Sequence, residues 1–579
     1  MGEAGARDVN TSPVASAPTP AAEATGITVS LEVLIWFGLI VVAAALRLLD
    51  LDGLPLTTDE AARALDAARV ADGDVPETWR GDLVAAGTSY LFRIFGETEF
   101  VARVVPAMAG AAVVPVLWSV RPYSGKLAAL VAASLVTISP LFVLYSRSAT
   151  PYSTGCLLAA VMMVCLFGYL SKPRTGLVFP LVVALALAPL TDAPAVVAAL
   201  AVLVFVVLEF MVFGNRDVRQ AFRAFRSSPL QWVSSLLVIV AAAQLGLTHF
   251  GTSLRADLPG VRLFADMFDL PRDSRSPEYH FALLSAYDWP ILIGGAAAFL
   301  FFAVKSASGG RGAVTPFERF LLVWTAAGAV TLALVTRREA GQLLILLLPL
   351  ALLAGSIVQE IASRLDWSEA SKWWPLAAVA AAPIAVGALL MTEWSSGNAG
   401  TVERAVLIAS PFVCLVVIAA IWTRSHAGAA VVAGGAAVLV AVPFMAHSSL
   451  AAAFSDGAEP AVDARLQPAA ERLRDTLEAL AAERGGTIVA DRDLLDELGW
   501  TLRDTPITFG GPAEGASVVV TRPDASPPGF AGLQEVWRVA EGWYPDEILA
   551  PRRLWRWFLY REPYGDVDAS EVRIYVRTI

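Results

Sequence analysis

Residues 56–63, Leu-Thr-Thr-Asp-Glu-Ala-Ala-Arg, follow the first long hydrophobic run of this 579-residue chain directly. The stretch sets two adjacent carboxylates, Asp59 and Glu60, beside a run long enough to cross a membrane. Residues 100–106, Phe-Val-Ala-Arg-Val-Val-Pro, open the next such run. Ionisable side chains at the edge of a membrane span are costly and mark functional sites by default. These two stretches are therefore the first candidates for a functional site.

The composition indicates a polytopic membrane protein. The chain is 56% hydrophobic and only 17% charged, and its mean hydropathy is +0.60. Apolar runs of about 20 residues, the length of a membrane-spanning helix, recur along it. The net charge of −10 argues against a nucleic-acid partner, which favours basic surfaces. The three cysteines lie inside apolar runs and are too few for a disulfide scaffold or a cysteine-rich metal site.

The apolar runs predict about thirteen membrane spans in a domain that covers residues 27–450. Their approximate bounds are 27–49, 100–119, 127–146, 153–171, 176–191, 194–213, 229–248, 289–304, 319–336, 342–358, 374–391, 405–422 and 427–446. The segment 192–194, Asp-Ala-Pro, is either a tight turn between two spans or a kink. Residues 1–26 lack an apolar period and are rich in Ala, Pro, Thr, Ser and Glu, which predicts a disordered tail.

Charge in the connecting segments predicts the orientation, because short cytoplasmic loops collect Lys and Arg. With a cytoplasmic N-terminus, ten basic residues of these segments fall together on the cytoplasmic side: Lys172, Arg174, Arg216, Arg219, Arg223, Arg226, Lys305, Arg311, Arg319 and Arg424. The same count places the loop 50–99, the loop 249–287 and everything after residue 446 outside. We therefore expect a multi-pass protein of the cell membrane with an extracytoplasmic C-terminal domain.

After the last span the pattern changes to that of a small α/β domain, residues 455–579. Residues 468–484 have the periodicity of an amphipathic helix, and residues 552–560 form a Trp-rich helix. Short β-type runs occur at 487–490, 507–509, 517–520 and 572–576. The expected fold class is mainly α, a polytopic helical membrane protein with a small C-terminal extracytoplasmic α/β domain.

Asp59 and Glu60 allow two interpretations. A carboxylate at the membrane boundary suits a general base that takes the proton of an attacking hydroxyl. Alternatively, Thr58 caps a helix whose first turn is acidic, and Arg63 stands at ion-pair spacing from both carboxylates. Helix starts are commonly acidic, so both interpretations stay open.

Several charged side chains stand near the same predicted boundary. They are Arg80 in the loop 50–99, Arg103 and Arg147 at the ends of two spans, and Arg337, Arg338 and Glu339 in a very short outer turn. Guanidinium groups suit a lipid-linked phosphate or pyrophosphate, whereas snorkelling or pairing with Glu339 explains each arginine singly. The four histidines have no ligand spacing, so no metal ligand is predicted. Mg²⁺ or Mn²⁺ bound by carboxylates is left as an alternative.

The order of these features resembles the GT-C membrane glycosyltransferases. This superfamily includes the dolichyl-phosphate-mannose protein mannosyltransferases and the lipid A aminoarabinose transferases, and the resemblance is closest to a prokaryotic branch described as flippase-activity-associated. It rests on Asp59-Glu60, on residues 95–106, on Ser139-Pro140, on Tyr145-Ser146-Arg147, on Glu339 before residues 348–355, and on Tyr560-Arg561-Glu562 and Tyr575-Val576-Arg577.

The resemblance implies a GT-C bundle whose first outer loop surrounds an active site. It implies transfer of a sugar, with inversion, from a polyprenyl-phosphate donor to a glycan, lipid or protein acceptor. Asp59 matches the carboxylate that activates or positions the acceptor, and Glu60 is expected to support it. The expected substrate contacts are Arg63, Arg80, Arg103, Arg147, Arg337, Arg338 and Glu339, with Glu60 and Glu339 as the ligands of any metal.

The chain departs from the closer branch at two places. That branch commonly carries His-Gly-Pro in the first outer loop, where this chain has Arg80-Gly81-Asp82, and an acidic residue after Tyr-Ser-Arg, where this chain has Ser148. These departures favour an alternative function, a non-catalytic protein that assists flipping or assembly of lipid-linked glycans. The Asp-Glu pair and the arginines favour the transferase.

Overall fold

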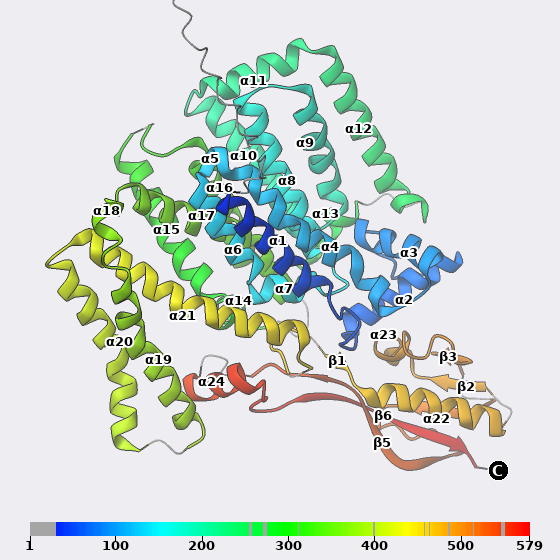
Figure 1. The fold of residues 1–579 in the computed structure, drawn as a ribbon. Helices are drawn as coiled ribbons and strands as arrows, with labels where there is room; N and C mark the ends of the chain where they lie inside the picture. The colour runs from blue at the N-terminus through cyan, green and yellow to red at the C-terminus, as the bar shows by residue number, and fades with distance from the viewer. Residues whose placement is uncertain are drawn as a thin grey trace, which may run out of the picture.

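The structure of the chain is a computed structural model (Figure 1). It describes residues 30–253, 258–269, 275–310, 312–397, 400–456, 458–462, 464–484, 487–512, 515–545 and 550–578. The predicted tail, residues 1–26, lies outside the described residues.

Eleven helical segments of the described chain are long and apolar enough to cross a membrane. They are α1 (Leu31–Leu48), α4 with η1 and α5 (Glu99–Ser124), α8 (Tyr152–Ser171), α10 (Ala193–Met211), α12 (Pro229–Leu247), α15 (Trp289–Ser308), α16 (Pro316–Leu334), η4 with α17 (Ala340–Ser363), α19 (Pro375–Ser395), α20 (Thr401–Trp422) and α21 (His426–Phe454). The mainly helical membrane fold is thus confirmed, with fewer full-length spans than the thirteen expected.

Two of the thirteen predicted spans take another form. The run 127–146 is a pair of helices, α6 (Lys126–Thr137) and α7 (Pro140–Ser146), that meet at 61°. Pro140 has no backbone N–H with which to continue α6, and the Ser139 side chain caps α7 by accepting from the Phe142 N–H at 3.2 Å. The run 176–191 is a shorter apolar helix, α9 (Thr175–Leu187), which ends in the 3₁₀ turn η2 (Ala188–Leu190). Counting the bent pair as one span gives twelve.

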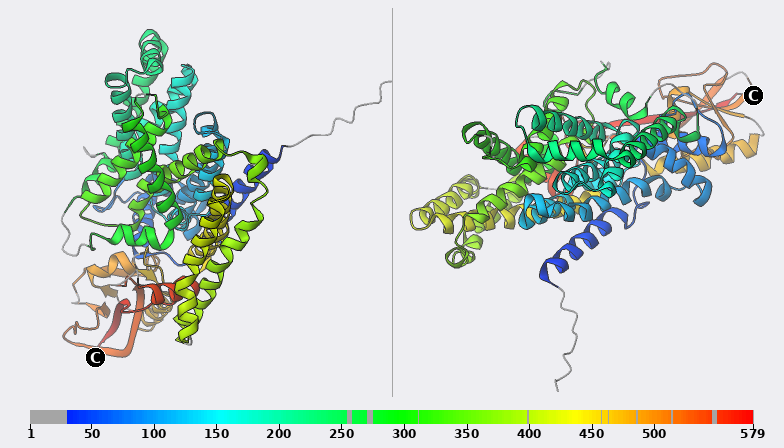
Figure 2. Two further views of the ribbon diagram at one scale, coloured as in Figure 1. Left: turned by 90° about the vertical axis from the view of Figure 1, so that its left-hand side faces the viewer. Right: turned by 90° about the horizontal axis from the view of Figure 1, so that it is seen from above.

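Helix α17 lies at the centre of the bundle, and α6, α15 and α16 pack around it. Its leucine-rich sequence is buried almost all round, as expected of a helix that contacts protein on every side. Helices α8, α10 and α4 continue the bundle on the other side. Helices α19 and α20 form a separate hairpin that packs with α21 at one edge of the molecule (Figures 1 and 2).

The segment between α1 and α4 contains two further helices, α2 (Thr58–Asp72) and α3 (Leu83–Phe95). The N-cap of α2 is Thr57, one residue before the predicted Thr58. Thr57 and Glu60 form a reciprocal capping box, in which each side chain bonds the other residue's backbone N–H. This cap fixes which way the first turn of α2 presents its two carboxylates.

The C-terminal part contains one six-stranded sheet with the strand order β1-β5-β6-β4-β2-β3. The strands are β1 (Arg465–Leu466), β2 (Thr487–Ala490), β3 (Ile507–Phe509), β4 (Ala516–Thr521), β5 (Phe530–Gly542) and β6 (Asp568–Arg577). Helix α22 (Pro468–Arg484) packs on the sheet, and α24 (Pro551–Tyr560) lies near the hairpin of α19 and α20 (Figure 1). The predicted helices and four strands are present, whereas β1 and β5 were not predicted.

The sheet domain is docked onto α2 and α3. Arg465 of β1 forms a β-bridge with Thr57, and the Leu466 N–H donates to the Leu56 carbonyl at 3.0 Å. Trp500 stacks on Phe92 of α3 with ring centroids 5.9 Å apart. The C-terminal domain therefore forms part of the surroundings of the helix that carries Asp59.

Candidate active site

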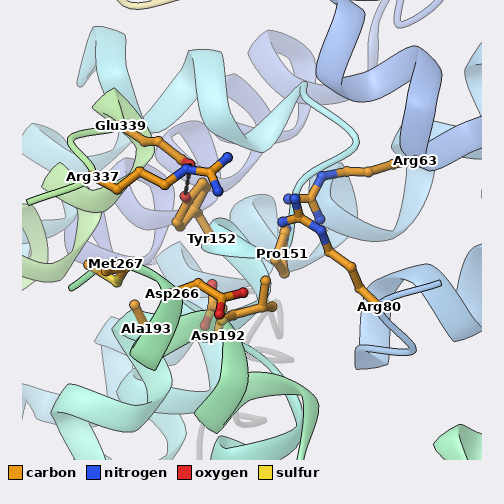
Figure 3. Close-up of a pocket in the computed structure, with 11 residues that line it drawn as sticks. Arg63, Arg80, Pro151, Tyr152, Asp192, Ala193, Asp266, Met267, Arg337 and Glu339 are labelled. Atoms are coloured by element: carbon orange, nitrogen blue, oxygen red, sulfur yellow. Dashed lines mark hydrogen bonds and ion pairs between the residues drawn. The ribbon is translucent and has the colours of Figure 1, made fainter. Parts of the chain in front are cut away.

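A cavity of about 520 Å³ opens where α2 meets the C-terminal domain. Its walls come from α2, from residues 78–85, from α13 (Pro259–Asp266), from Arg337, and from α23 (Leu495–Leu498) of the C-terminal domain. A smaller chamber of about 30 Å³ adjoins it and shares Arg63, Arg80, Leu263, Asp266 and Arg337 (Figure 3). The volume is typical of a small-molecule site.

Helix α2 presents three charged side chains to this cavity, because Asp59, Arg63 and Asp66 recur at helical spacing on one face. The Arg63 Nε donates to Asp59 Oδ2 at 2.9 Å. The Asp59 side chain nevertheless keeps 43% of its surface exposed. Burial raises the pKa of Asp59, but the positive charges of Arg63, Arg80 and Arg337 outweigh it and hold the pKa below its usual value. Asp59 is therefore an ionised carboxylate that a ligand in the cavity can reach.

Glu60, the neighbour of Asp59, faces away from the cavity. Arg103 donates to both of its carboxylate oxygens at 2.9 Å, and the backbone N–H groups of Thr57 and Ala149 donate to it at 2.9 and 2.7 Å. The Glu60 and Arg103 side chains are 3% and 5% exposed. All their strong hydrogen-bonding capacity is used inside the protein, so the expected roles of Glu60 in catalysis and Arg103 in phosphate binding are not supported by their positions.

Arg147 is also held away from the cavity. Its guanidinium donates to the carbonyls of Leu46, Leu49 and Asp50 at 3.2, 2.7 and 2.6 Å. These carbonyls belong to the C-terminal end of α1, where backbone acceptors lack helical partners and attract a cation. Arg147 thus caps α1, and the expected phosphate contact is not supported by its position.

Three of the expected arginines, Arg63, Arg80 and Arg337, do line the cavity. Figure 3 shows the guanidinium groups of Arg63 and Arg80 side by side on one wall. Arg80 has no hydrogen bond or ion pair with any residue that the structure describes. Two cations this close repel each other, so an anion bound between them would stabilise this wall of the cavity.

Gly81 allows the loop to place Arg80 on this wall. Its φ of +64° lies in the left-handed region, and a Cβ atom there would stand 2.6 Å from Nδ1 of the buried His249. The next residue, Asp82, caps α3 through Oδ1 at 2.9 Å from the Val84 N–H and approaches Arg63 Nη1 at 3.8 Å. The sequence Arg-Gly-Asp therefore serves a tight turn at this point.

The expected turn 337–339 contributes Arg337 and Glu339 but not Arg338. Glu339 pairs with Arg337 at 3.1 Å and accepts from the Tyr152 hydroxyl at 2.7 Å, both within the chamber (Figure 3). Arg338 instead donates to the Arg275 carbonyl at 2.7 Å and does not line the described cavity.

Sequence reasoning missed several carboxylates of the site. Asp66 accepts from the Thr78 hydroxyl at 2.9 Å, and burial, with a further contribution from Asp496, raises its pKa. Asp496 reaches the cavity from the C-terminal domain. Asp192, which the sequence marked only as part of a turn or kink, caps α10 and lines the chamber with 1% exposure. The helical spacing of Asp66 from Asp59 and Arg63 is a local signal that could have found it, whereas contacts distant in sequence bring Asp192 and Asp496 to the site.

The described residues contain no group of three His, Cys, Asp or Glu side chains placed to hold a metal ion. Binding of Mg²⁺ or Mn²⁺ by Glu60 and Glu339 stays a prediction. The cations that the structure does supply next to Asp59 are guanidinium groups.

Comparisons with known proteins give one consistent result. A family model described as dolichyl-phosphate-mannose-protein mannosyltransferase matches residues 83–243, from α3 to α12. The crystal structure of ArnT from Cupriavidus metallidurans bound to undecaprenyl phosphate superimposes with a TM-score of 0.52 at 17% identity, covering 85% of this chain and 93% of that chain.

The archaeal oligosaccharyltransferase AglB from Archaeoglobus fulgidus, in complex with an inhibitory peptide and a dolichol-phosphate, also has a TM-score of 0.52. It is 12% identical over 85% of this chain and 69% of that chain. No curated protein matches the sequence. Similarity at this level shows a shared fold.

Proposed function

We propose that this chain, which has the fold of the GT-C superfamily of membrane glycosyltransferases, is an inverting glycosyltransferase. It moves a sugar from a polyprenyl-phosphate donor to a glycan, lipid or protein acceptor at the predicted outer face of the membrane. The observation that carries the proposal is the convergence of Arg63, Arg80 and Arg337 on a cavity that also exposes Asp59. The named ligands of ArnT and AglB, undecaprenyl phosphate and dolichol-phosphate, support the class of donor.

The arginines suit the leaving group of this reaction. When the bond between sugar C1 and the phosphate oxygen breaks, negative charge accumulates on the phosphate, and guanidinium forks stabilise that charge. Arg80 has no hydrogen bond or ion pair with a described residue. Arg63, by contrast, pairs with Asp59, and Arg337 pairs with Glu339. We therefore assign the main phosphate contact to Arg80.

Asp59 suits the acceptor. In inversion the acceptor oxygen forms its bond to C1 in the same displacement that releases the phosphate, and its proton passes to a base. An ionised, partly exposed carboxylate is in the right state to receive it. Thr78, Asp66 and Asp496 line the same cavity, and their side-chain oxygens can accept hydrogen bonds from the hydroxyl groups of the acceptor substrate.

One observation favours the alternative, a non-catalytic protein that binds lipid-linked glycans and assists their flipping or assembly. The charge of Asp59 is already balanced by Arg63 at 2.9 Å, which makes the carboxylate a weak base. A site of this kind could bind a donor without turning it over. The experiment must therefore measure binding and turnover separately.

The test supplies the purified protein with labelled polyprenyl-phosphate sugars and a panel of acceptors, and measures acceptor-dependent release of polyprenyl phosphate. It is run with Mg²⁺, with Mn²⁺ and with a chelator, since the metal requirement is a prediction. Asp59→Asn should lower kcat by about 10²–10⁴-fold. Asp72→Asn, on an exposed position of the same helix that does not line the cavity, is the matched control.

Arg80→Gln should raise the donor KM by about tenfold or more, the usual cost of one hydrogen bond to a charged group. Turnover that survives Asp59→Asn unchanged would remove Asp59 from the mechanism. Donor binding without turnover for any acceptor would replace the transferase by the assisting function.

A further inference from the structure

A second cationic groove lies away from the candidate active site, beside the Trp-rich helix α24. It has a volume of about 400 Å³ and is lined by Arg552, Arg553, Arg556, Ser395, Glu562, Pro563 and Tyr564. None of these residues lines the cavity around Asp59. The proposed glycosyl transfer leaves this groove without a role.

Helix α24 is fixed in place by its aromatic face. Trp555 donates to the Thr392 hydroxyl at 3.2 Å, and Trp557 donates to the Ala458 carbonyl at 2.8 Å. Phe558 stacks on Phe444 of α21 with centroids 4.3 Å apart and planes at 4°. These contacts tie α24 to the last turns of α19, to α21 and to the segment that follows α21. Figures 1 and 2 show α24 beside these elements. The opposite face of α24 carries the three arginines.

The arginines bring more positive charge to the groove than its described lining residues neutralise. Arg556 pairs with Glu562 at 2.6 Å, and Arg552 reaches the Ser395 carbonyl at 3.4 Å, which offers no formal charge. Arg553 has no hydrogen bond or ion pair with any described residue. Against three guanidinium groups the lining supplies one carboxylate, so an anion with several acceptor oxygens fits the remaining donors.

The position of the groove along the membrane normal indicates the source of that anion. Helix α19 has 21 residues, which at 1.5 Å each span about 31 Å, the thickness of the hydrocarbon core. Ser395, its last residue, therefore lies at the level of lipid headgroups. The preceding turns of α19 keep apolar side chains exposed, with Leu389 at 70% and Val386 at 44%, as expected where acyl chains cover a helix.

We propose that the α24 groove binds the phosphate of an anionic phospholipid headgroup and so fastens the C-terminal domain to the membrane surface. Arg553 and Arg552 contact the phosphate oxygens, and the acyl chains lie along α19. Basic side chains on an interfacial helix attract anionic lipids in this way.

The test measures retention of phosphatidylglycerol and phosphatidylcholine by the purified full-length protein in detergent, by native mass spectrometry. Wild type should retain phosphatidylglycerol in preference to phosphatidylcholine. Arg553→Gln should weaken phosphatidylglycerol binding about fivefold, and Arg552→Gln/Arg553→Gln about 25-fold, from the usual contribution of one basic residue near a charged membrane surface. Arg538→Gln, at an exposed arginine of β5, should leave binding unchanged.

The single variant keeps the test decisive, because replacing Arg553 breaks no hydrogen bond or ion pair with a residue that the structure describes. Equal retention by wild type and Arg553→Gln, or equal loss in Arg538→Gln, would overturn the proposal. Inorganic phosphate at roughly tenfold excess over the lipid should displace little phosphatidylglycerol, because inorganic phosphate lacks acyl chains. Complete displacement would show a site for soluble phosphate instead. No arm of this test depends on glycosyl transfer.

Discussion

Replacing Arg103 with Met tests whether the Glu60–Arg103 pair supports the fold or the substrate. Arg103 donates two hydrogen bonds to Glu60 at 2.9 Å and three more to the carbonyls of Leu51, Leu54 and Pro55 at 2.6–3.0 Å. Both charged side chains are at least nine-tenths buried. The substitution leaves the Glu60 carboxylate buried with only its two backbone donors.

Breaking a buried ion pair by removing one partner costs about 3–5 kcal/mol. We therefore expect Arg103→Met to lower the midpoint of thermal denaturation, followed by tryptophan fluorescence, by several degrees. The donor KM of the fraction that stays folded should be unchanged. Glu60→Gln/Arg103→Met, which removes both charges, should recover part of the lost stability.

The control for this prediction is Arg69→Met, which removes an arginine of α2 that has no ion pair with a described residue. It should denature like wild type. The reasoning would be refuted by an Arg103→Met protein that denatures like wild type but binds the donor tenfold more weakly, because Arg103 would then contact the substrate after all.

Three further predictions concern the cavity. The positive charge of Arg63 helps to hold the pKa of Asp59 below its usual value. Wild-type activity that needs ionised Asp59 is therefore lost only as pH falls through that lowered pKa. Arg63→Gln should move the acid limb of the plot of kcat against pH to higher pH. Gly81→Ala should cost about 1–2 kcal/mol of loop stability and raise the donor KM, whereas a wild-type donor KM would show that the turn does not position the phosphate contact. Asp496→Asn should raise the KM of a glycan acceptor but not of the donor, while Asp493→Asn, outside the cavity lining, should change neither.

Hydropathy predicted the membrane domain well because each span is a local property of about 20 residues. The resemblance to the GT-C superfamily is confirmed by the shared fold. The hydropathy of residues 127–146 predicts one span, whereas the structure has the bent pair α6 and α7; Pro140 is the local signal for the break. The orientation of the bundle stays a prediction from the positions of Lys and Arg.

The candidate site was predictable only in part. Adjacent residues of a helix point about 100° apart, so Asp59 and Glu60 face different surroundings. No local pattern indicates which of the two meets Arg103. The Tyr152–Glu339 hydrogen bond joins residues 187 positions apart, and no local pattern records such a contact. Strand β5 was missed because its pairing with β6, rather than a strict alternation of apolar residues, holds it in the sheet.

The Thr58 hydroxyl of α2 donates a hydrogen bond to the Ala464 carbonyl, which lies 406 positions later in the chain. During synthesis α2 leaves the ribosome early, whereas Ala464, Trp500 and Asp496 follow only after every span has been made. The wall of the cavity that contains Leu495 and Asp496 is thus added only after α21 has been made, and the nascent protein cannot hold the complete cavity before then. The order of synthesis therefore leaves the cavity incomplete until the segment that contains Ala464 and Asp496 has folded onto α2.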